Sequence, residues 1–224
     1  MRKPVIFFDV IETLFSLEPL RVGFQQLSMP KGSDKVFFAQ LLRDAFALSA
    51  TGQFYTFPEI AAASLEVLLK NADQEASPEQ IQTLLKTFAQ LPPHADVRAG
   101  LERARDGGAE VVLLTNGSKQ NTEGLLKAGK LTDLVDQVVS IETLQVWKPK
   151  PEVYAQAARK LGVEPQAACL VAAHAWDLQG AQQAGMKTVW VRRQDVLYHR
   201  LMGDPQGMAN SLEEAVAIAL QLLD

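Results

Sequence analysis

The sequence places polar residues of complementary chemistry at the ends of four predicted strands. Together they provide a carboxylate of the nucleophile type, a hydroxyl and an amide that can bind oxygen, a cation, and a second carboxylate. They are Asp9 with Thr13, Thr115 with Asn116, Lys148, and His174 with Asp177. Burying an aspartate at the end of an apolar strand costs free energy unless the carboxylate is paired or used. One such use is covalent catalysis, with the carboxylate as nucleophile.

Each of these residues also has a simpler structural explanation. Asp9 and Asp177 are good helix N-caps, and Lys148 is of a type that is usually exposed to solvent. The segment Thr115-Asn116-Gly117 is also compatible with a plain turn between a strand and a helix. It is the combination of groups that favours a functional site.

The elements that must position these residues follow from the apolar spacing. Continuous apolar runs predict buried strands at 5–8, 111–114, 169–171 and 188–191, with a weaker strand around 138–139. Between the first two strands, the spacing in residues 17–91 is helical, with about four helices, of which one starts at Ser77. Further helices are expected at 97–105, 151–161 and 177–184, and from Ser211 onward.

This order predicts an α/β fold. We expect a Rossmann-like, doubly wound, mainly parallel sheet formed by residues 1–15 and 92–224, with residues 16–91 inserted as a helical cap domain. The carboxyl ends of parallel strands gather ligands at one edge of such a sheet. The four polar strand ends should therefore meet.

Charge, apolar patterning and cysteine content give no reason to expect a nucleic-acid-binding or membrane protein. The net charge of −4 gives no reason to expect a nucleic-acid partner. The apolar run before Asp9 is too short for a signal peptide or a membrane span, so no membrane association is expected. The one cysteine, Cys169, lies in an apolar strand, which predicts an inert buried thiol and fits a reducing cytoplasm. A small-molecule substrate is the expected partner.

Four motifs resemble those of the haloacid dehalogenase superfamily. Asp9 and Thr13 match its first motif, Thr115-Asn116-Gly117 its second, Lys148 its third and Asp177 its fourth. The resemblance spans nearly the whole chain, including the helical insertion. It implies that Asp9 is a covalent nucleophile.

Two positions argue against the phosphatases of this superfamily. These carry a second aspartate two residues after the nucleophile, where this chain has Ile11, and an early acidic residue in motif four, where it has Ala172 or Ala173. If Mg²⁺ were bound, its ligands would be Asp9, Asp177 and the Ile11 carbonyl. Because Mg²⁺ prefers charged oxygen ligands in a nearly octahedral array, that site would be weak, and no cofactor is expected.

The L-2-haloacid dehalogenase branch matches better. Ala175-Trp176-Asp177 is identical to the end of its fourth motif, and Lys148 and Tyr154 fall where that family has them. The resemblance implies that Asp9 displaces halide from a small 2-halocarboxylate and forms an ester. Lys148 would balance the charge of Asp9, and Asp177 would orient or deprotonate the water that attacks the ester. Thr115 and Asn116 would bind the substrate carboxylate.

The chain departs from that family at several places. Phe38 replaces a halide-binding arginine of the cap, which leaves Lys35 as a candidate substitute. Ile11 replaces a tyrosine and Glu12 a glycine, and His174 stands where the family has asparagine. His174 is either a base beside Asp177 or a hydrogen-bonding partner, and Glu12 is either an added acid or a solvated loop residue.

We therefore predict a dehalogenase-like hydrolase, with Ile11, Phe38, Tyr154, His174 and Trp176 also near the substrate. Two alternatives stay open: a phosphatase with a depleted metal site, and a scaffold with little turnover that acts as a binding protein. Because related dehalogenases dimerise through cap helices, a homodimer is also expected from the resemblance.

Overall fold

A six-stranded sheet forms the centre of the molecule, in the computed structural model that describes residues 3–224. Its strand order is β3-β2-β1-β4-β5-β6, and all neighbouring strands pair in parallel. The strands are β1 (Val5–Phe8), β2 (Glu110–Thr115), β3 (Gln137–Ser140), β4 (Ala168–Ala172), β5 (Lys187–Val191) and β6 (Gly207–Ala209). The predicted doubly wound α/β fold is confirmed.

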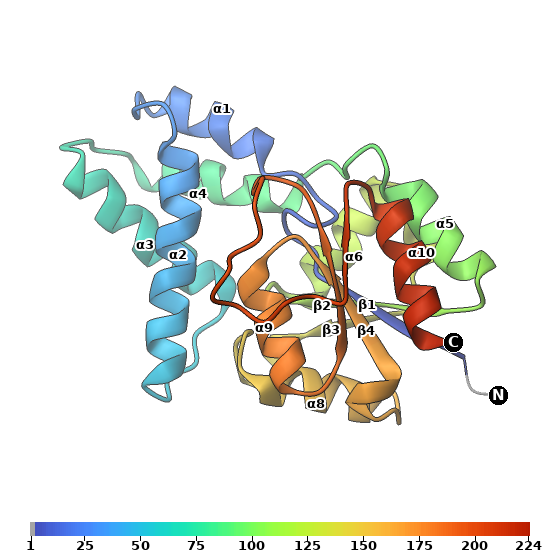
Figure 1. Ribbon diagram of the computed structural model, residues 1–224. Helices are drawn as coiled ribbons and strands as arrows, with labels where there is room; N and C mark the ends of the chain where they lie inside the picture. Colours follow the sequence, from blue (N-terminus) through green and yellow to red (C-terminus); the bar gives the residue numbers. More distant parts are fainter. Residues whose placement is uncertain (1–2) are drawn as a thin grey trace.

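Helices cover both faces of this sheet (Figure 1). Helix α5 (Val97–Asp106) packs against α10 (Leu212–Leu223) on one face, and α8 (Pro151–Lys160) packs against α9 (Ala175–Gln183) on the other. The remaining core helices are α6 (Lys119–Ala128) and the short α7 (Ile141–Leu144), together with the 3₁₀ turns η2 (Thr132–Leu134) and η3 (Pro165–Ala167).

Between β1 and α5 the regular elements are all helical, joined by loops. This segment contains α1 (Glu18–Gln26), α2 (Ser33–Ala50), α3 (Phe57–Asn71), α4 (Pro78–Lys86) and the 3₁₀ turn η1 (Thr87–Ala89). Figure 1 shows α1 to α4 grouped beside the sheet. The indole Nε1 of Trp147 links the two parts by donating to the Tyr55 carbonyl at 2.8 Å. The division into a core and a cap domain stays a prediction, and residues 1 and 2 of that core lie outside the described residues.

Local sequence signals account for several helix starts. Ser77 caps α4 by accepting from the Gln80 amide, and Ser211 caps α10 in the same way. Sequence reasoning did not find α6 or the three-residue strand β6. It also placed the start of α9 two residues late, because the helix begins at Ala175 and its N-cap is His174. The alternative that Asp177 is an N-cap is therefore wrong.

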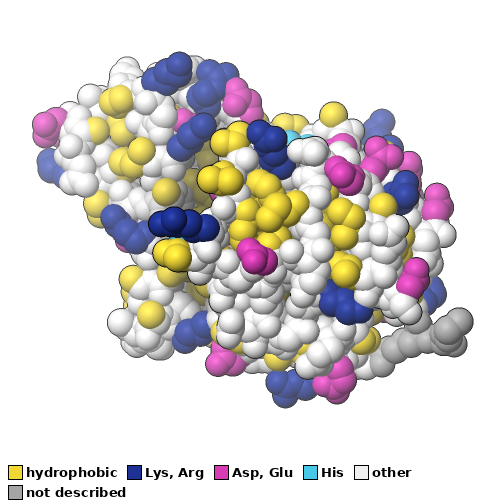
Figure 2. Space-filling model, in the orientation of Figure 1, with side chains coloured by type: hydrophobic (Ala, Val, Ile, Leu, Met, Phe, Trp, Pro, Cys, Tyr) yellow, Lys and Arg dark blue, Asp and Glu magenta, His cyan; other side chains and the backbone are white. Residues whose placement is uncertain are grey.

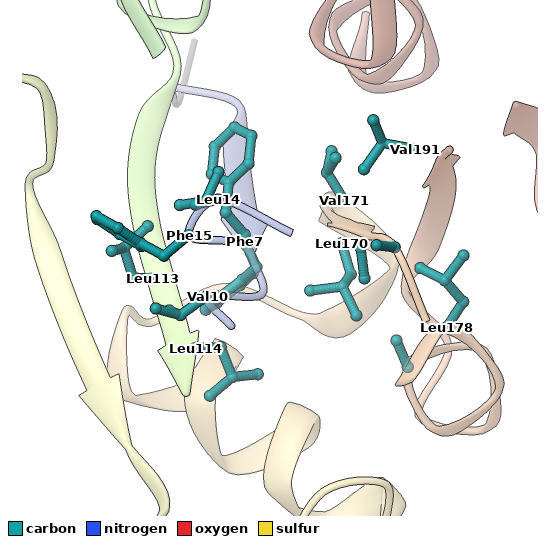
Figure 3. Close-up of a cluster of buried hydrophobic side chains, with 14 of the residues drawn as sticks. Phe7, Val10, Leu14, Phe15, Leu113, Leu114, Leu170, Val171, Leu178 and Val191 are labelled. Atoms are coloured by element: carbon teal, nitrogen blue, oxygen red, sulfur yellow. The ribbon is translucent and has the colours of Figure 1, made fainter. Parts of the chain in front are cut away.

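Apolar side chains from the strands and their flanking helices fill the space on both sides of the sheet (Figure 3). Phe7, Leu113 and Leu170 of the central strands are fully buried, and Leu178 of α9 packs into the same cluster. Because β1 lies between β2 and β4, no edge of it meets solvent. This burial makes β1 a rigid support for the residue that follows it. Among residues 3–224, no helix is both long and apolar enough to cross a bilayer.

Candidate active site

Three neighbouring strands bring the predicted site residues together at their carboxyl ends. Asp9 follows β1, Thr115 ends β2 and His174 lies two residues beyond β4. The Asp9 amide donates to the Val171 carbonyl at 3.1 Å, which fixes the aspartate against the end of β4. The chain order changes direction here, since β2 and β4 flank β1 on opposite sides. This is where doubly wound sheets bind ligands.

The ammonium group of Lys148 lies at the centre of the site and is fully buried. It donates to Asp9 Oδ1 at 2.7 Å, to Asp177 Oδ2 at 2.7 Å and to the Leu114 carbonyl at 2.9 Å. All its donors are therefore used within the protein. Burial alone would lower the pKa of Lys148, but Asp177 and Asp9 raise it, so the side chain stays charged.

Asp9 is held as a carboxylate. Burial by itself would raise its pKa, but Lys148 and His174 together lower it well below the ordinary value. The Thr13 hydroxyl donates to Asp9 Oδ2 at 2.6 Å and accepts from the Ala173 amide at 2.9 Å. The side chain of Asp9 is 8% exposed. These contacts orient a charged, nearly dry carboxylate, as a nucleophile requires.

Asp177 differs from Asp9 in its environment. Its side chain is fully buried, and the Tyr154 hydroxyl donates to Oδ1 while Lys148 holds Oδ2. Burial raises the pKa of Asp177, and the nearby charge of Asp9 adds to this, against the opposing effect of Lys148. Gly180 permits this packing, because a Cβ there would overlap the Pro149 carbonyl and the Tyr154 ring.

His174 and Glu12 form a second charged pair beside the nucleophile. The imidazole Nε2 lies 2.8 Å from Glu12 Oε2, and Nδ1 lies 3.4 Å from Asp9 Oδ2. Burial would lower the pKa of His174, but Asp9 and Glu12 raise it to about 10. The ring stacks on Trp176, with centroids 5.1 Å apart. The two carboxylates therefore favour the charged form of the His174 ring.

Two clefts are lined by residues of the loop that follows Asp9, although Asp9 itself lines neither. The larger one, about 1140 Å³, lies between the helical segment and the core, and both Glu12 and His174 line it. Ile11, Gly117 and Ser118 line the smaller cleft, of about 440 Å³, on the other side of the loop after β1. Figure 2 shows Lys and Arg side chains over the α1–α2 part of the surface and hydrophobic side chains near the middle of the same face.

Some of the predicted substrate-binding residues line a cleft, whereas others have hydrogen-bond partners within the protein. Phe38 and Trp176 line the larger cleft, and the Phe38 ring lies 6.3 Å from that of His174. Thr115 and Asn116 have internal partners: the Thr115 hydroxyl accepts from the Gly117 amide at 2.9 Å, and Asn116 Oδ1 accepts from the Lys148 amide at 3.1 Å. Their substrate-binding role stays a prediction.

Lys35 also lines the larger cleft, with an exposed side chain. It is thus on the same side of the site as Phe38, where the resemblance would put a halide-binding cation. Its role as a substitute for the missing arginine stays a prediction.

Sequence reasoning missed two structural contributors. Arg193 pairs with Asp96 through both guanidinium NH groups, at 2.9 and 3.0 Å, and its Nε donates to the Thr13 carbonyl at 3.1 Å. No local pattern connects Arg193 to Asp96 across so many residues. His94 lies 3.0 Å from the Glu12 carbonyl through Nε2, a contact that joins positions far apart in the sequence.

The arrangement does not fit a magnesium ion. Each carboxylate oxygen of Asp9 and Asp177 already accepts a hydrogen bond from Lys148, Thr13 or Tyr154. Within residues 3–224, no group of three or more His, Cys, Asp and Glu side chains could hold a metal ion. Since Mg²⁺ takes about six oxygen ligands, the carboxylates of Asp9 and Asp177 with the Ile11 carbonyl would supply only part of its coordination.

Comparisons with known proteins agree with this geometry. A family model described as haloacid dehalogenase-like hydrolase matches residues 4–185. (S)-2-haloacid dehalogenase 4A of Burkholderia cepacia is 32% identical over 142 residues, which is 63% of this chain and 62% of that protein, so the match spans less than two thirds of it.

Solved structures extend the likeness over the whole fold. A dehalogenase with an intermediate complex is 25% identical, with a TM-score of 0.87 and coverage of 95% of both chains. The L-2-haloacid dehalogenase of Xanthobacter autotrophicus with chloropropionic acid covalently bound shares the fold, with 18% identity, a TM-score of 0.88 and coverage of 97% of this chain and 98% of that one.

Proposed function

The chain belongs to the haloacid dehalogenase-like hydrolases, and we propose that it replaces the halogen of a small 2-halocarboxylate by a hydroxyl group without a metal ion. The observation that carries the proposal is the Asp9–Lys148 contact of 2.7 Å in a buried site. This contact keeps Asp9 ionised, which supports a role for its carboxylate as the nucleophile. The relatives named as haloacid dehalogenases support this choice of substrate class.

In the first step, an Asp9 oxygen attacks C2 of the substrate from the side opposite the halogen. A C–O bond forms, the carbon–halogen bond breaks and the halide leaves with the electron pair. The negative charge of Asp9 is lost in this step. Lys148 and Thr13 orient the carboxylate, and Lys148 remains beside Asp177 when Asp9 becomes neutral.

In the second step, water attacks the Asp9 carboxyl carbon. The bond between that carbon and the ester oxygen breaks, and the product leaves as a 2-hydroxycarboxylate. Binding of the substrate carboxylate by Thr115 and Asn116, or by the amides around Gly117 next to the smaller cleft, belongs to the same proposal. Ile11 and Trp176 would contact the substrate from the two clefts.

The proposal is tested with L-2-chloropropionate in the presence of EDTA. We expect chloride release and, after rapid acid quenching, a protein heavier by the substrate without its chlorine. Asp9→Asn should lower chloride release by at least about 10³-fold, because the amide is not a nucleophile, while its circular dichroism stays that of the wild type.

Two other results would redirect the assignment. Phosphate release from an aryl phosphate that requires Mg²⁺, without chloride release, would support the phosphatase alternative. No turnover of either substrate by a folded chain would support the binding-protein alternative. Labelling in H₂¹⁸O adds a further check, because attack at the carboxyl carbon puts the first ¹⁸O atom into Asp9 and not into the product.

Assembly and location stay predictions. A homodimer would have exposed apolar side chains available on the helical segment, namely Val22, Val36, Tyr55 and Val67. Size-exclusion chromatography with light scattering tests it. The expected cytoplasmic location depends on the single cysteine and the apolar patterning alone.

A further inference from the structure

Thr13 holds one oxygen of the Asp9 carboxylate, yet it lies in a turn between β1 and α1, outside any helix or strand. Its hydroxyl donates to Asp9 Oδ2 at 2.6 Å and accepts from the Ala173 amide at 2.9 Å. These contacts fix only the side chain of Thr13. The orientation of the Asp9 carboxylate therefore also depends on what holds the backbone of Thr13 in place.

Arg193 binds the backbone of Thr13. Its Nε donates to the Thr13 carbonyl at 3.1 Å. Within residues 3–224, no other group donates a hydrogen bond to that carbonyl. Because Thr13 is fully buried, its carbonyl depends on this donor, and a buried carbonyl without a partner is unfavourable. Loss of the guanidinium should therefore let the turn that contains Thr13 move.

Asp96 fixes the guanidinium of Arg193 through two parallel hydrogen bonds. Arg193 donates to Asp96 Oδ1 at 2.9 Å and to Oδ2 at 3.0 Å. The pair is mostly buried, since the side chains of Arg193 and Asp96 are 10% and 21% exposed. A pair of this kind is geometrically specific because both groups are planar. It leaves Nε as the donor that binds the Thr13 carbonyl.

The carboxylate of Asp96 does not serve the helix that it precedes. Asp96 is the N-cap of α5, where aspartate ordinarily binds amides of its own helix, but its side chain makes no such bond. Instead, Asp96 Oδ2 accepts from the amide of Leu212, the first residue of α10, at 2.8 Å. Helices α5 and α10 pack against each other. The support of Arg193 is therefore anchored in the core of the molecule.

We propose that Arg193, held by Asp96, is a positioning residue that sets the direction in which the Asp9 nucleophile attacks. This inference rests on the proposed function. Asp96 orients Arg193, and Arg193 fixes the carbonyl of Thr13. The Thr13 hydroxyl in turn fixes Oδ2 of Asp9. Arg193 also lines the larger cleft, but Asp96 balances its charge, so it acts through Thr13 and does not bind the substrate.

The step that should depend on these contacts is the displacement of the halide. An Asp9 oxygen must approach C2 along the line opposite the carbon–halogen bond, so a rotated carboxylate is misaligned for attack. Lys148 holds the other oxygen, Oδ1, with or without Arg193. Movement of the turn would therefore rotate the carboxylate about that contact and slow formation of the ester. The surfaces that bind the substrate would not change.

The first test is Arg193→Lys, which keeps the charge but cannot bind Asp96 and the Thr13 carbonyl with one planar group. In single turnovers with L-2-chloropropionate, we expect ester formation to slow by about 10–10²-fold, while the half-saturating substrate concentration stays within roughly threefold of the wild-type value. Arg192→Lys, at the exposed neighbouring position, is the matched control and should react normally. Arg105→Lys, which alters a different arginine–aspartate pair, should also react normally.

The second test determines whether Arg193 acts through Thr13. Thr13→Val removes the hydroxyl at similar size and should itself slow ester formation. In that background, Arg193→Lys should cause a further change of less than about threefold, because the connection to Asp9 is already broken. Two independent effects would multiply. Intact mass recorded over hours follows ester formation even in the slow double variant.

A third variant, Asp96→Asn, frees Arg193 from its support without changing Arg193 itself. It should slow ester formation in the same direction as Arg193→Lys, again with little change in the half-saturating substrate concentration. If circular dichroism shows that Arg193→Lys does not fold, the same measurements on Asp96→Asn, alone and with Thr13→Val, decide the question.

The outcomes separate the two proposals. If the wild type releases no chloride and forms no ester, the proposed function fails and the role of Arg193 fails with it. If the wild type is active and folded Arg193→Lys forms ester at the wild-type rate, only the role of Arg193 is overturned. A raised half-saturating concentration with an unchanged rate would assign Arg193 to substrate binding and also overturn it. Effects that multiply with those of Thr13→Val would do the same.

Discussion

The two sides of Asp9 differ in how fully their polar groups are satisfied. On the buried side, Lys148, Asp177 and Tyr154 use every donor and acceptor that the network offers, and all three side chains are buried. On the cleft side, Glu12 and His174 are partly exposed, and His174 Nδ1 has no hydrogen-bond partner. The fully hydrogen-bonded network on the buried side keeps Asp9 ionised. The partly exposed groups on the cleft side can exchange protons with water. The difference predicts that substitutions on the buried side mainly lower stability, whereas those on the cleft side mainly change its pH dependence.

Removing the cation of the buried side should have the largest effect on stability. Lys148→Met leaves Asp9 and Asp177 facing each other without a counter-charge in a buried site. We expect the free energy of unfolding to fall by about 3–5 kcal/mol, measured by urea denaturation. Lys35→Met, at an exposed position, is the control and should change it by less than about 0.5 kcal/mol. Equal effects of the two substitutions would contradict the assignment of Lys148 to a buried network.

A smaller loss is expected from Tyr154→Phe. The substitution removes the hydroxyl that donates to Asp177 Oδ1 and leaves that oxygen buried without its partner. The free energy of unfolding should fall by about 1–3 kcal/mol, with the same denaturation assay. The control is Tyr55→Phe, whose side chain is exposed and whose backbone carbonyl, which binds Trp147, is unchanged. A Tyr154→Phe protein as stable as the control would show that solvent reaches Asp177.

Substitutions on the cleft side should change how the free energy of unfolding depends on pH, by less than the substitutions on the buried side change the free energy itself. The pKa of His174 is raised from 6.5 to about 10 in the folded protein, with burial opposing and the two carboxylates outweighing it. Its contribution to stability is therefore complete below pH 6.5 and is lost as the pH rises through 10. Glu12→Gln removes one of these carboxylates, so the decline in unfolding free energy between these pH values should be shallower than in the wild type.

The control for this measurement is Glu18→Gln, which removes an exposed carboxylate that pairs with Arg21 on the surface. It should leave the pH dependence of stability as in the wild type. If Glu12→Gln and the wild type declined in parallel, the pairing of Glu12 with His174 would carry no charge stabilisation, and the contrast between the two sides of the site would weaken.

The sequence by itself determined the strands and the identity of the central residues. Four continuous apolar runs indicate strands that are buried on both faces. Because these strands are parallel, their carboxyl ends bring Asp9, Thr115 and His174 to one edge of the sheet. The alternation of strands and helices also indicated the doubly wound fold. The strand β6 escaped notice because three residues with one glycine carry no periodicity.

Only the tertiary structure decided how the polar groups pair. Tyr154 contacts Asp177, Arg193 contacts Asp96 and Glu12 contacts His174 because separate elements pack side by side, and no spacing rule relates such positions. Burial, which decides whether a carboxylate can meet water, is likewise a property of the packed molecule. Asp9, which follows β1, and Asp177, in the first turn of α9, are the same residue type in one buried network, yet their pKa values move in opposite directions because their surroundings differ.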